Sequence, residues 1–133
     1  MAWRSVLVAT IAAGCGVEDE ADYVASRADA ECTRLQACAL GYFESEYGDA
    51  EDCVDERADD LDEAGKALED AGCDFELDEA GACVTRIRSL SCEDWAENDH
   101  AAACDLVWTC EQIPYTYYGY GYDYGGGVPR GSP

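Results

Sequence analysis

Residues 1–15 read MAWRSVLVATIAAGC, and this stretch decides the fold because it predicts the compartment in which the later cysteines react. One basic residue, Arg4, precedes an apolar run from Val6 to Ala13, and small residues and a cysteine follow. That order is typical of an export signal. The run is too short to cross a bilayer as a helix, which needs about 20 apolar residues. We therefore expect residues 1–14 to be a signal peptide that is removed.

The end of this stretch, Ala12-Ala13-Gly14-Cys15, resembles a bacterial lipobox, in which a cysteine that follows small residues is acylated and becomes the mature N-terminus. The resemblance implies a lipid on Cys15 that binds a membrane, with residues 15–22 as a tether. Gly16 stands where an Asp would retain such a lipoprotein at the inner membrane, so the implied location is the outer membrane. The alternatives are ordinary signal cleavage, which gives a periplasmic or secreted product, or a start codon assigned in the wrong place.

The number of cysteines supports export. Nine cysteines leave one unpaired in an oxidised chain, and lipidation of Cys15 accounts for the odd one. The remaining eight are then expected to form four disulfides in an oxidising envelope. They are Cys32, Cys38, Cys53, Cys73, Cys83, Cys92, Cys104 and Cys110.

Length and charge indicate the size of the domain and the kind of partner. Residues 23–112 are expected to form one small domain, whose marginal core is helped by disulfides worth about 2–4 kcal/mol each. The chain has a formal net charge of −22, which becomes −23 when the single charge of Arg4 is lost with the signal peptide. Such a surface should repel nucleic acid, attract basic partners and bind cations weakly.

The first half of the domain has apolar residues at helical spacing. The pattern predicts a helix over residues 23–42 that stops near Gly41, followed by a turn over residues 41–48. Asp49 is a plausible N-cap for a second helix, and Gly72 ends that helix as a C-terminal cap residue. The acidic residues of the second helix cover the faces that its apolar stripe leaves open.

The second half is predicted to be helical as well. A third helix begins at Asp78, Ser91 is spaced from Asp94 like a capping box that starts a further turn, and a last helix covers about residues 99–111. No stretch alternates apolar and polar residues as a half-buried strand does. The expected fold is all-α: a small disulfide-stapled bundle of about four helices in antiparallel order, with a disordered Tyr/Gly-rich C-terminal tail.

This helix order predicts a disulfide connectivity. Two pairs should face each other across helical hairpins, one pair should join a connector to the helix that follows it, and elimination leaves a pair that ties the first helix to the last. The hairpin pairs are Cys38–Cys53 and Cys92–Cys104. The connector pair is Cys73–Cys83, and the pair left by elimination is Cys32–Cys110. Eight cysteines allow 105 pairings, so other connectivities stay open.

Composition changes abruptly in residues 113–133, which contain the run PYTYYGYGYDYGGGVPRGSP. This segment cannot bury enough apolar surface to order itself, so we expect a disordered tail. The alternative is a contact strip, since tyrosines between glycines can stack on sugar rings or on one another. Its tyrosines are Tyr115, Tyr117, Tyr118, Tyr120, Tyr122 and Tyr124.

The run GCDFELDEAGACVTRIRSLSC, followed by CDLVWTC, resembles a group of small, cysteine-patterned predicted lipoproteins of Gram-negative bacteria. The resemblance covers roughly residues 32–110. It implies an exported helical domain, and it implies no activity.

Metal sites are not expected. Zinc sites use pairs of cysteines with two to four residues between them. The closest pairs here, Cys32 with Cys38 and Cys104 with Cys110, have five residues between them. Part of a calcium loop occurs at Asp60, Asp62 and Gly65, but Ala71 stands where the loop needs a Glu, and the stretch lies inside an amphipathic helix.

Catalysis is not expected either, and no cofactor is. His100 is the only histidine, and it has no nearby nucleophile that is not better used in a disulfide. The many carboxylates belong to polar helix faces, no glycine-rich phosphate loop follows a strand, and Trp95 and Trp108 fit a core better than a ligand platform.

Two function classes remain. The first is a non-catalytic interaction or structural module of the cell envelope, which contacts an envelope protein, a glycan or cations. The second is an envelope enzyme or enzyme accessory that uses clustered carboxylates with His100. A hollow that gathers His100 with two or more carboxylates favours the second class, whereas a convex bundle favours the first.

Overall fold

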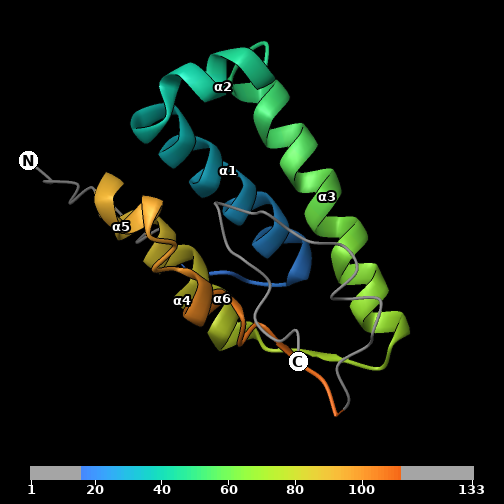
Figure 1. Cartoon of the computed structure of the whole chain (residues 1–133). Coiled ribbons are helices and arrows are strands. Elements are labelled where there is room, and N and C mark those ends of the chain that lie inside the picture. The colour runs from blue at the N-terminus through green and yellow to red at the C-terminus, as the bar shows by residue number, and fades with distance from the viewer. Residues whose placement is uncertain (1–15, 112–133) are drawn as a thin grey trace, which may run out of the picture.

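Helix α1 (Glu20–Cys38) is the central element of the fold, which we describe from a computed structural model for residues 16–111 (Figure 1). It packs against α3 on one side and α4 on the other. The other elements, in chain order, are α2 (Leu40–Glu46), α3 (Ala50–Asp70), β1 (Asp74–Phe75), α4 (Leu77–Ser89), α5 (Cys92–Ala96), α6 (Ala101–Cys104) and β2 (Trp108–Thr109). The predicted all-α, disulfide-stapled fold is confirmed, since four of these helices have seven residues or more.

Two aspartates cap the long helices. The side chain of Asp49 accepts a hydrogen bond from Asp52 N and starts α3, as predicted. Asp19 does the same for α1 through Asp22 N, so α1 begins three residues earlier than predicted. Residues 20–22 of the predicted tether therefore belong to α1, and Val17 already packs against the core. The predicted boundaries at residues 15 and 113 lie outside the described residues.

Helix α2 occupies most of the predicted turn over residues 41–48, so that prediction is wrong. The chain breaks helical geometry only at Ala39, and a second short helix then begins at Leu40. Phe43 explains this, because its side chain is only 4% exposed and its ring lies 5.6 Å from that of Tyr47. Burial of one aromatic ring outweighs the weak helix propensity of Gly41.

Helices α3 and α5 end in the same way, with a residue in the left-handed region. Gly72 has φ 83°, and Gly72 N and Cys73 N donate to the last carbonyls of α3, so the predicted end of this helix is confirmed. Asn98, with φ 61°, plays the same role after α5. Ser91 caps α5 through Asp94 N, as predicted.

The predicted last helix over residues 99–111 is mostly wrong. Helix α6 ends at Cys104, and Trp108–Thr109 pairs with Asp74–Phe75 in an antiparallel ribbon. The pairing is fixed by packing, because the rings of Phe75 and Trp108 meet edge to face at 5.4 Å. Two-residue strands are too short to show the alternation that identifies a strand in sequence.

The disulfides join other cysteines than predicted, and all four predicted pairs (Cys38–Cys53, Cys73–Cys83, Cys92–Cys104 and Cys32–Cys110) are wrong. The structure has Cys32–Cys53, Cys38–Cys92, Cys73–Cys110 and Cys83–Cys104. Helix α2 is the cause at the first hairpin, because it lengthens the connection and brings Cys32 opposite Cys53. The ribbon is the cause at the other end, because β1 and β2 bring Cys73 beside Cys110.

The core lies where α1, α3, α4 and the ribbon meet. Its fully buried apolar side chains include Ile87, Leu90 and Val107, and Trp95 is also buried. None of the helices within residues 16–111 has the length and apolar character that crossing a bilayer requires.

We predict that peptide mapping under non-reducing conditions will recover the four pairs of the structure. Replacing Cys32 and Cys53 together with alanine should lower the free energy of unfolding by about 3 kcal/mol, because the bond closes a loop of 21 residues. Chemical denaturation measures this change. A peptide that joins Cys38 to Cys53 would contradict the structure.

Candidate functional site

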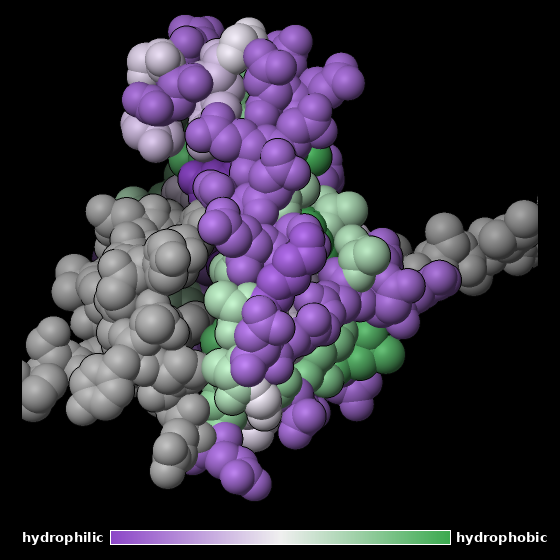
Figure 2. Space-filling view, turned by 90° about the vertical axis from the view of Figure 1, so that its right-hand side faces the viewer, coloured by the Kyte–Doolittle hydropathy of each residue, from purple (hydrophilic) through white to green (hydrophobic). Residues whose placement is uncertain are grey.

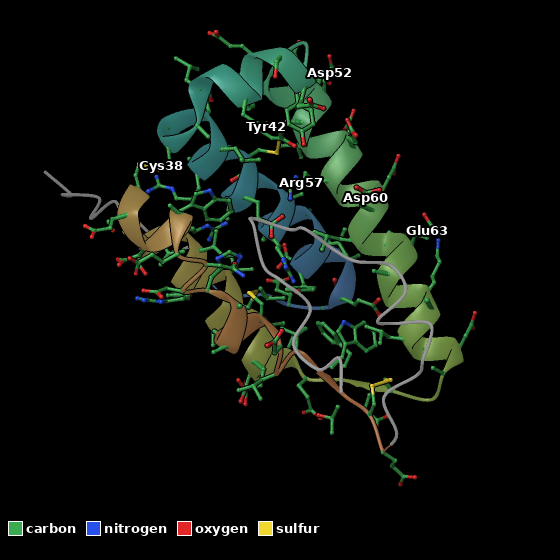
Figure 3. The ribbon with its side chains drawn as sticks, viewed as in Figure 1. Cys38, Tyr42, Asp52, Arg57, Asp60 and Glu63 are labelled. Atoms are coloured by element: carbon green, nitrogen blue, oxygen red, sulfur yellow. A yellow bond between two sulfur atoms is a disulfide. The ribbon has the colours of Figure 1, made fainter. Side chains whose placement is uncertain are left out.

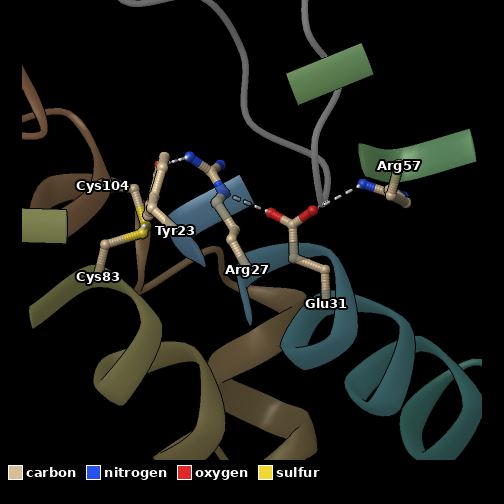
Figure 4. Close-up of polar contacts among 6 residues, drawn as sticks. All are labelled: Tyr23, Arg27, Glu31, Arg57, Cys83 and Cys104. Atoms are coloured by element: carbon tan, nitrogen blue, oxygen red, sulfur yellow. Dashed lines mark hydrogen bonds and ion pairs between the residues drawn. A yellow bond between two sulfur atoms is a disulfide. The ribbon is translucent and has the colours of Figure 1, made fainter. Parts of the chain in front are cut away.

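A series of polar contacts crosses the interior from α3 through α1 toward α4 (Figure 4). Glu31 is fully buried and accepts hydrogen bonds from Arg27 Nε at 3.0 Å and from Arg57 Nη1 at 3.2 Å. Arg27 Nη1 also donates to the Tyr23 hydroxyl at 2.7 Å, and that hydroxyl lies 3.9 Å from Cys83 Sγ. We call Tyr23, Arg27, Glu31 and Arg57 the buried polar chain.

Both arginines of the buried polar chain keep their charge. Burial by itself lowers the pKa of Arg27, but the Glu31 carboxylate and Tyr23 outweigh it, so the pKa is raised. Burial likewise opposes the charge of Arg57, and Glu31 together with a hydrogen bond to Tyr47 raises its pKa. Neither guanidinium can therefore act as a general acid near neutral pH. The buried polar chain is a structural ion cluster that joins α1 to α3, and the Tyr23 hydroxyl extends it to Cys83 on α4.

His100 lies in the interior, immediately before α6. It is 1% exposed, and its ring stacks on Trp95 with centroids 4.9 Å apart and planes 10° from parallel. Burial lowers its pKa, an effect that the Glu31 carboxylate opposes. Its Nδ1 has no hydrogen-bond partner. Of the carboxylates that act on His100, Glu31 is already bonded to two arginines, so this pair is not set up for proton transfer to a substrate.

A hollow of about 380 Å³ lies between the N-terminal segment, α1 and α4. It does not include His100. Its walls are polar, and Asp22 is held there by hydrogen bonds from Glu18 N and Ser26 Oγ. The lining residues are Gly16, Val17, Glu18, Asp22, Ser26, Val84 and Arg88. An enzyme would be favoured by a hollow that gathers His100 with two carboxylates. This hollow does not have that arrangement, because His100 does not line it.

The outer face of α3 is the most acidic surface of the described domain. Figure 2 shows this face as an almost continuous hydrophilic strip, and Figure 3 shows Glu63 on its outer side while Arg57 points toward α1. Lys66 is the one exposed cation of α3, and it pairs with Asp62 at 2.6 Å. The exposed acids are Glu51, Asp52, Asp55, Glu56, Asp59, Asp60, Asp62, Glu63, Glu69 and Asp70. We call them the acidic face.

Metal-ligand geometry is not found in this part of the chain. Within residues 16–111, no group of three or more His, Cys, Asp or Glu side chains is arranged to hold a metal ion. Asp60, Asp62 and Gly65 lie inside α3, as predicted for the partial calcium loop. The acidic face is a surface of exposed carboxylates along α3, without a defined coordination site among the described residues.

Glu20, in the first turn of α1, is a carboxyl group with a strongly raised pKa next to the acidic face. Gly65 leaves room for it, since a Cβ built there would lie 2.8 Å from Glu20 Oε1. Burial, a hydrogen bond with Glu69 and the negative charges of Glu69 and Asp62 together raise the pKa of Glu20 to about 7. The first turn of α1 is thus joined to the last turns of α3 by a carboxyl group that takes up a proton as the pH falls through about 7.

The sequence-predicted site residues fall into two groups. Cys15 and the six tail tyrosines lie outside the described residues. The eight other cysteines are all in disulfides, although in other pairs, and Trp95 and His100 are core residues. The buried polar chain was missed. Its signal is present in the sequence, because Arg57 falls on the buried stripe of α3 between Cys53 and Leu61 at four-residue spacing.

Comparison with known proteins gave no match to a family model, a curated protein or a solved structure.

We predict that Glu31→Gln will lower the free energy of unfolding by about 3–5 kcal/mol, because it leaves two buried guanidinium groups without their carboxylate. Thermal or urea denaturation measures the change. The matched control is Asp62→Asn, which breaks the exposed ion pair with Lys66 and should have little effect. Equal effects of the two variants would show that the buried polar chain adds no stability of its own.

We also predict that the contribution of Glu20 to the free energy of unfolding falls as the pH rises from about 4.5 to about 7. The folded state binds the Glu20 proton more tightly than the unfolded chain, so raising the pH across this window removes stability. Glu20→Gln should remove this part of the slope and should make the protein more stable than wild type at pH 8.

The difference between wild type and Glu20→Gln isolates the contribution of Glu20, because His100 contributes equally to the pH dependence of stability in both proteins. The contribution of His100 has the opposite sign to that of Glu20. The lowered pKa of His100 costs stability as the pH falls below its ordinary value near 6.5. Melting temperatures across pH 4–8 give both curves. Parallel curves for wild type and Glu20→Gln would rule out the shared proton.

Proposed function

We propose that this protein is an exported, lipid-anchored interaction or structural module of the cell envelope and that it is not an enzyme. The observation that carries the proposal is the use of the cysteines. All eight cysteines of residues 16–111 are in disulfides, which leaves Cys15 as the ninth. Four disulfides in so small a domain are consistent with an extracellular or envelope location.

The surface supports a binding role rather than a catalytic one. The ionisable groups of the interior are bonded to one another or stacked in the core, and the acidic face is exposed on the surface (Figure 2). Such a surface attracts basic polypeptides and cations at long range and repels nucleic acid. In this proposal the rigid domain presents the acidic face, and the tyrosine-rich tail makes weak contacts with a glycan or an envelope protein.

The anchor is tested by intact-mass analysis of the protein from membrane fractions. We predict a chain that begins at Cys15 and carries added acyl mass, with more than one acyl chain because stable membrane residence requires it. Cys15→Ser is the matched control and should release the protein from the membrane. A mature chain that begins at another residue, or wild-type protein that stays soluble without detergent, would exclude the anchor.

The tail is tested by deleting residues 114–133 and measuring retention on purified cell wall or polysaccharide. Each stacking tyrosine is expected to add about 0.5–1.5 kcal/mol, enough together for weak, multivalent attachment. Loss of retention supports a contact role for the tail. Retention that follows the folded domain would place the binding surface on the acidic face, which a second measurement at high salt would then weaken.

A further inference from the structure

The Cys38–Cys92 disulfide differs from the other three in its exposure. Cys92 is exposed and Cys38 is half-buried, whereas Cys32, Cys53 and Cys83 are 3%, 0% and 0% exposed. The bond joins the last residue of α1 to the first residue of α5, with Cα atoms 5.1 Å apart. Figure 3 shows Cys38 at the end of α1 that lies near α5. An external reagent can therefore approach this bond from solvent.

Exposure matters because thiol–disulfide exchange begins with direct attack of a thiolate on one sulfur of the bond. Cys92 is the more exposed residue of the pair, so we take its Sγ as the sulfur that an external thiolate attacks. Cys38 then supplies the leaving group. The three remaining disulfides each have at least one cysteine that is 7% exposed or less, and attack on them requires local opening.

Arg34 carries a positive charge on the same helix as Cys38 and contacts the segment that leads to Cys92. It lies one helical turn before Cys38 on α1, and its Nη1 donates to Leu90 O at 2.9 Å, two residues before Cys92. The guanidinium thus lies between the two segments that the disulfide joins. Its Nε is buried and has no hydrogen-bond partner. A nearby cation favours the thiolate form of a cysteine, and a stabilised leaving thiolate departs faster.

We propose that Cys38–Cys92 is a thiol–disulfide exchange site that accepts an external thiol. The thiolate attacks Cys92 Sγ and forms a mixed disulfide with it, and the electron pair of the broken bond leaves on Cys38 as a thiolate. A second thiol then attacks the sulfur of the bound thiol, frees Cys92 as a thiolate and leaves as a disulfide. The two external thiols are oxidised by two electrons, and Cys38–Cys92 is reduced by two. This proposal does not depend on lipidation of Cys15.

Reduction of this one bond has a local consequence. Helix α5 has five residues, and after reduction it is held by the Ser91 cap and by Trp95, which stacks on His100. The bond between α1 and α3 and the two bonds of the C-terminal half remain. Loosening of α5 should therefore change the environment of Trp95 while the long helices stay folded.

The test uses the wild-type protein and graded concentrations of reduced glutathione. Samples are alkylated with one reagent, fully reduced, alkylated with an isotopically distinct reagent and mapped by mass spectrometry. We expect Cys38 and Cys92 to be labelled first, with the far-ultraviolet circular dichroism unchanged and the fluorescence of Trp95 altered. Earlier labelling of any other pair, or labelling of all eight cysteines together, would overturn the proposal.

The role of Arg34 is tested with two variants. Arg34→Gln should slow the labelling of Cys38 and Cys92 by about threefold, the effect of losing one partly exposed charge interaction, whereas Arg34→Lys should restore most of the rate. Rates are compared under conditions in which Cys83 and Cys104 stay unlabelled, so that unfolding does not contribute. Equal rates for Gln and Lys would show that the charge of Arg34 does not assist the leaving thiolate.

Discussion

Covalent cross-links between elements that have little apolar surface to share are the constraint on which the structure depends. Helix α1 is linked to α3 by Cys32–Cys53 and to α5 by Cys38–Cys92, and the ribbon and α6 are closed by the other two bonds. A domain of this size buries too little surface to outweigh the entropy of its chain comfortably. Cross-links lower the entropy of the unfolded chain, so a surface crowded with like charges can still enclose a core.

In the interior, ion pairs offset the cost of burying a charged group. A carboxylate such as Glu31 is costly to bury, and the guanidinium groups of Arg27 and Arg57 compensate for that cost. Replacement of such a cluster by apolar side chains is often neutral or stabilising in other proteins, so its contribution here is better sought in specificity. The cluster favours the observed register of α1 against α3, because that register brings Arg57 onto Glu31.

Local signals were sufficient for the start and the end of α3 and insufficient for the disulfide connectivity. The Asp49 cap and the left-handed Gly72 depend on neighbours within a few residues, and the sequence predicts both. The disulfide pairs depend on where α2 and the ribbon lie, and those depend on the burial of Phe43 and on the packing of Phe75 against Trp108. Contacts of this kind join residues far apart in the chain, and no periodicity within a short window records them. Likewise, the spacing of Arg57 places it on the buried stripe of α3, but no local pattern identifies its partner Glu31, which lies 26 residues away in the chain.

The early start of α1 has a consequence for how the domain would be held. Asp19 caps the helix and Val17 is packed against the core, so Gly16 is the one residue between Cys15 and the packed part of the domain. One extended residue spans at most about 3.6 Å. If Cys15 is inserted in a bilayer, the domain has no slack with which to swing away from it. The domain would then stay close to the lipid headgroups, and the direction in which α1 leaves the membrane surface would set its orientation. It would contact only partners that reach this layer.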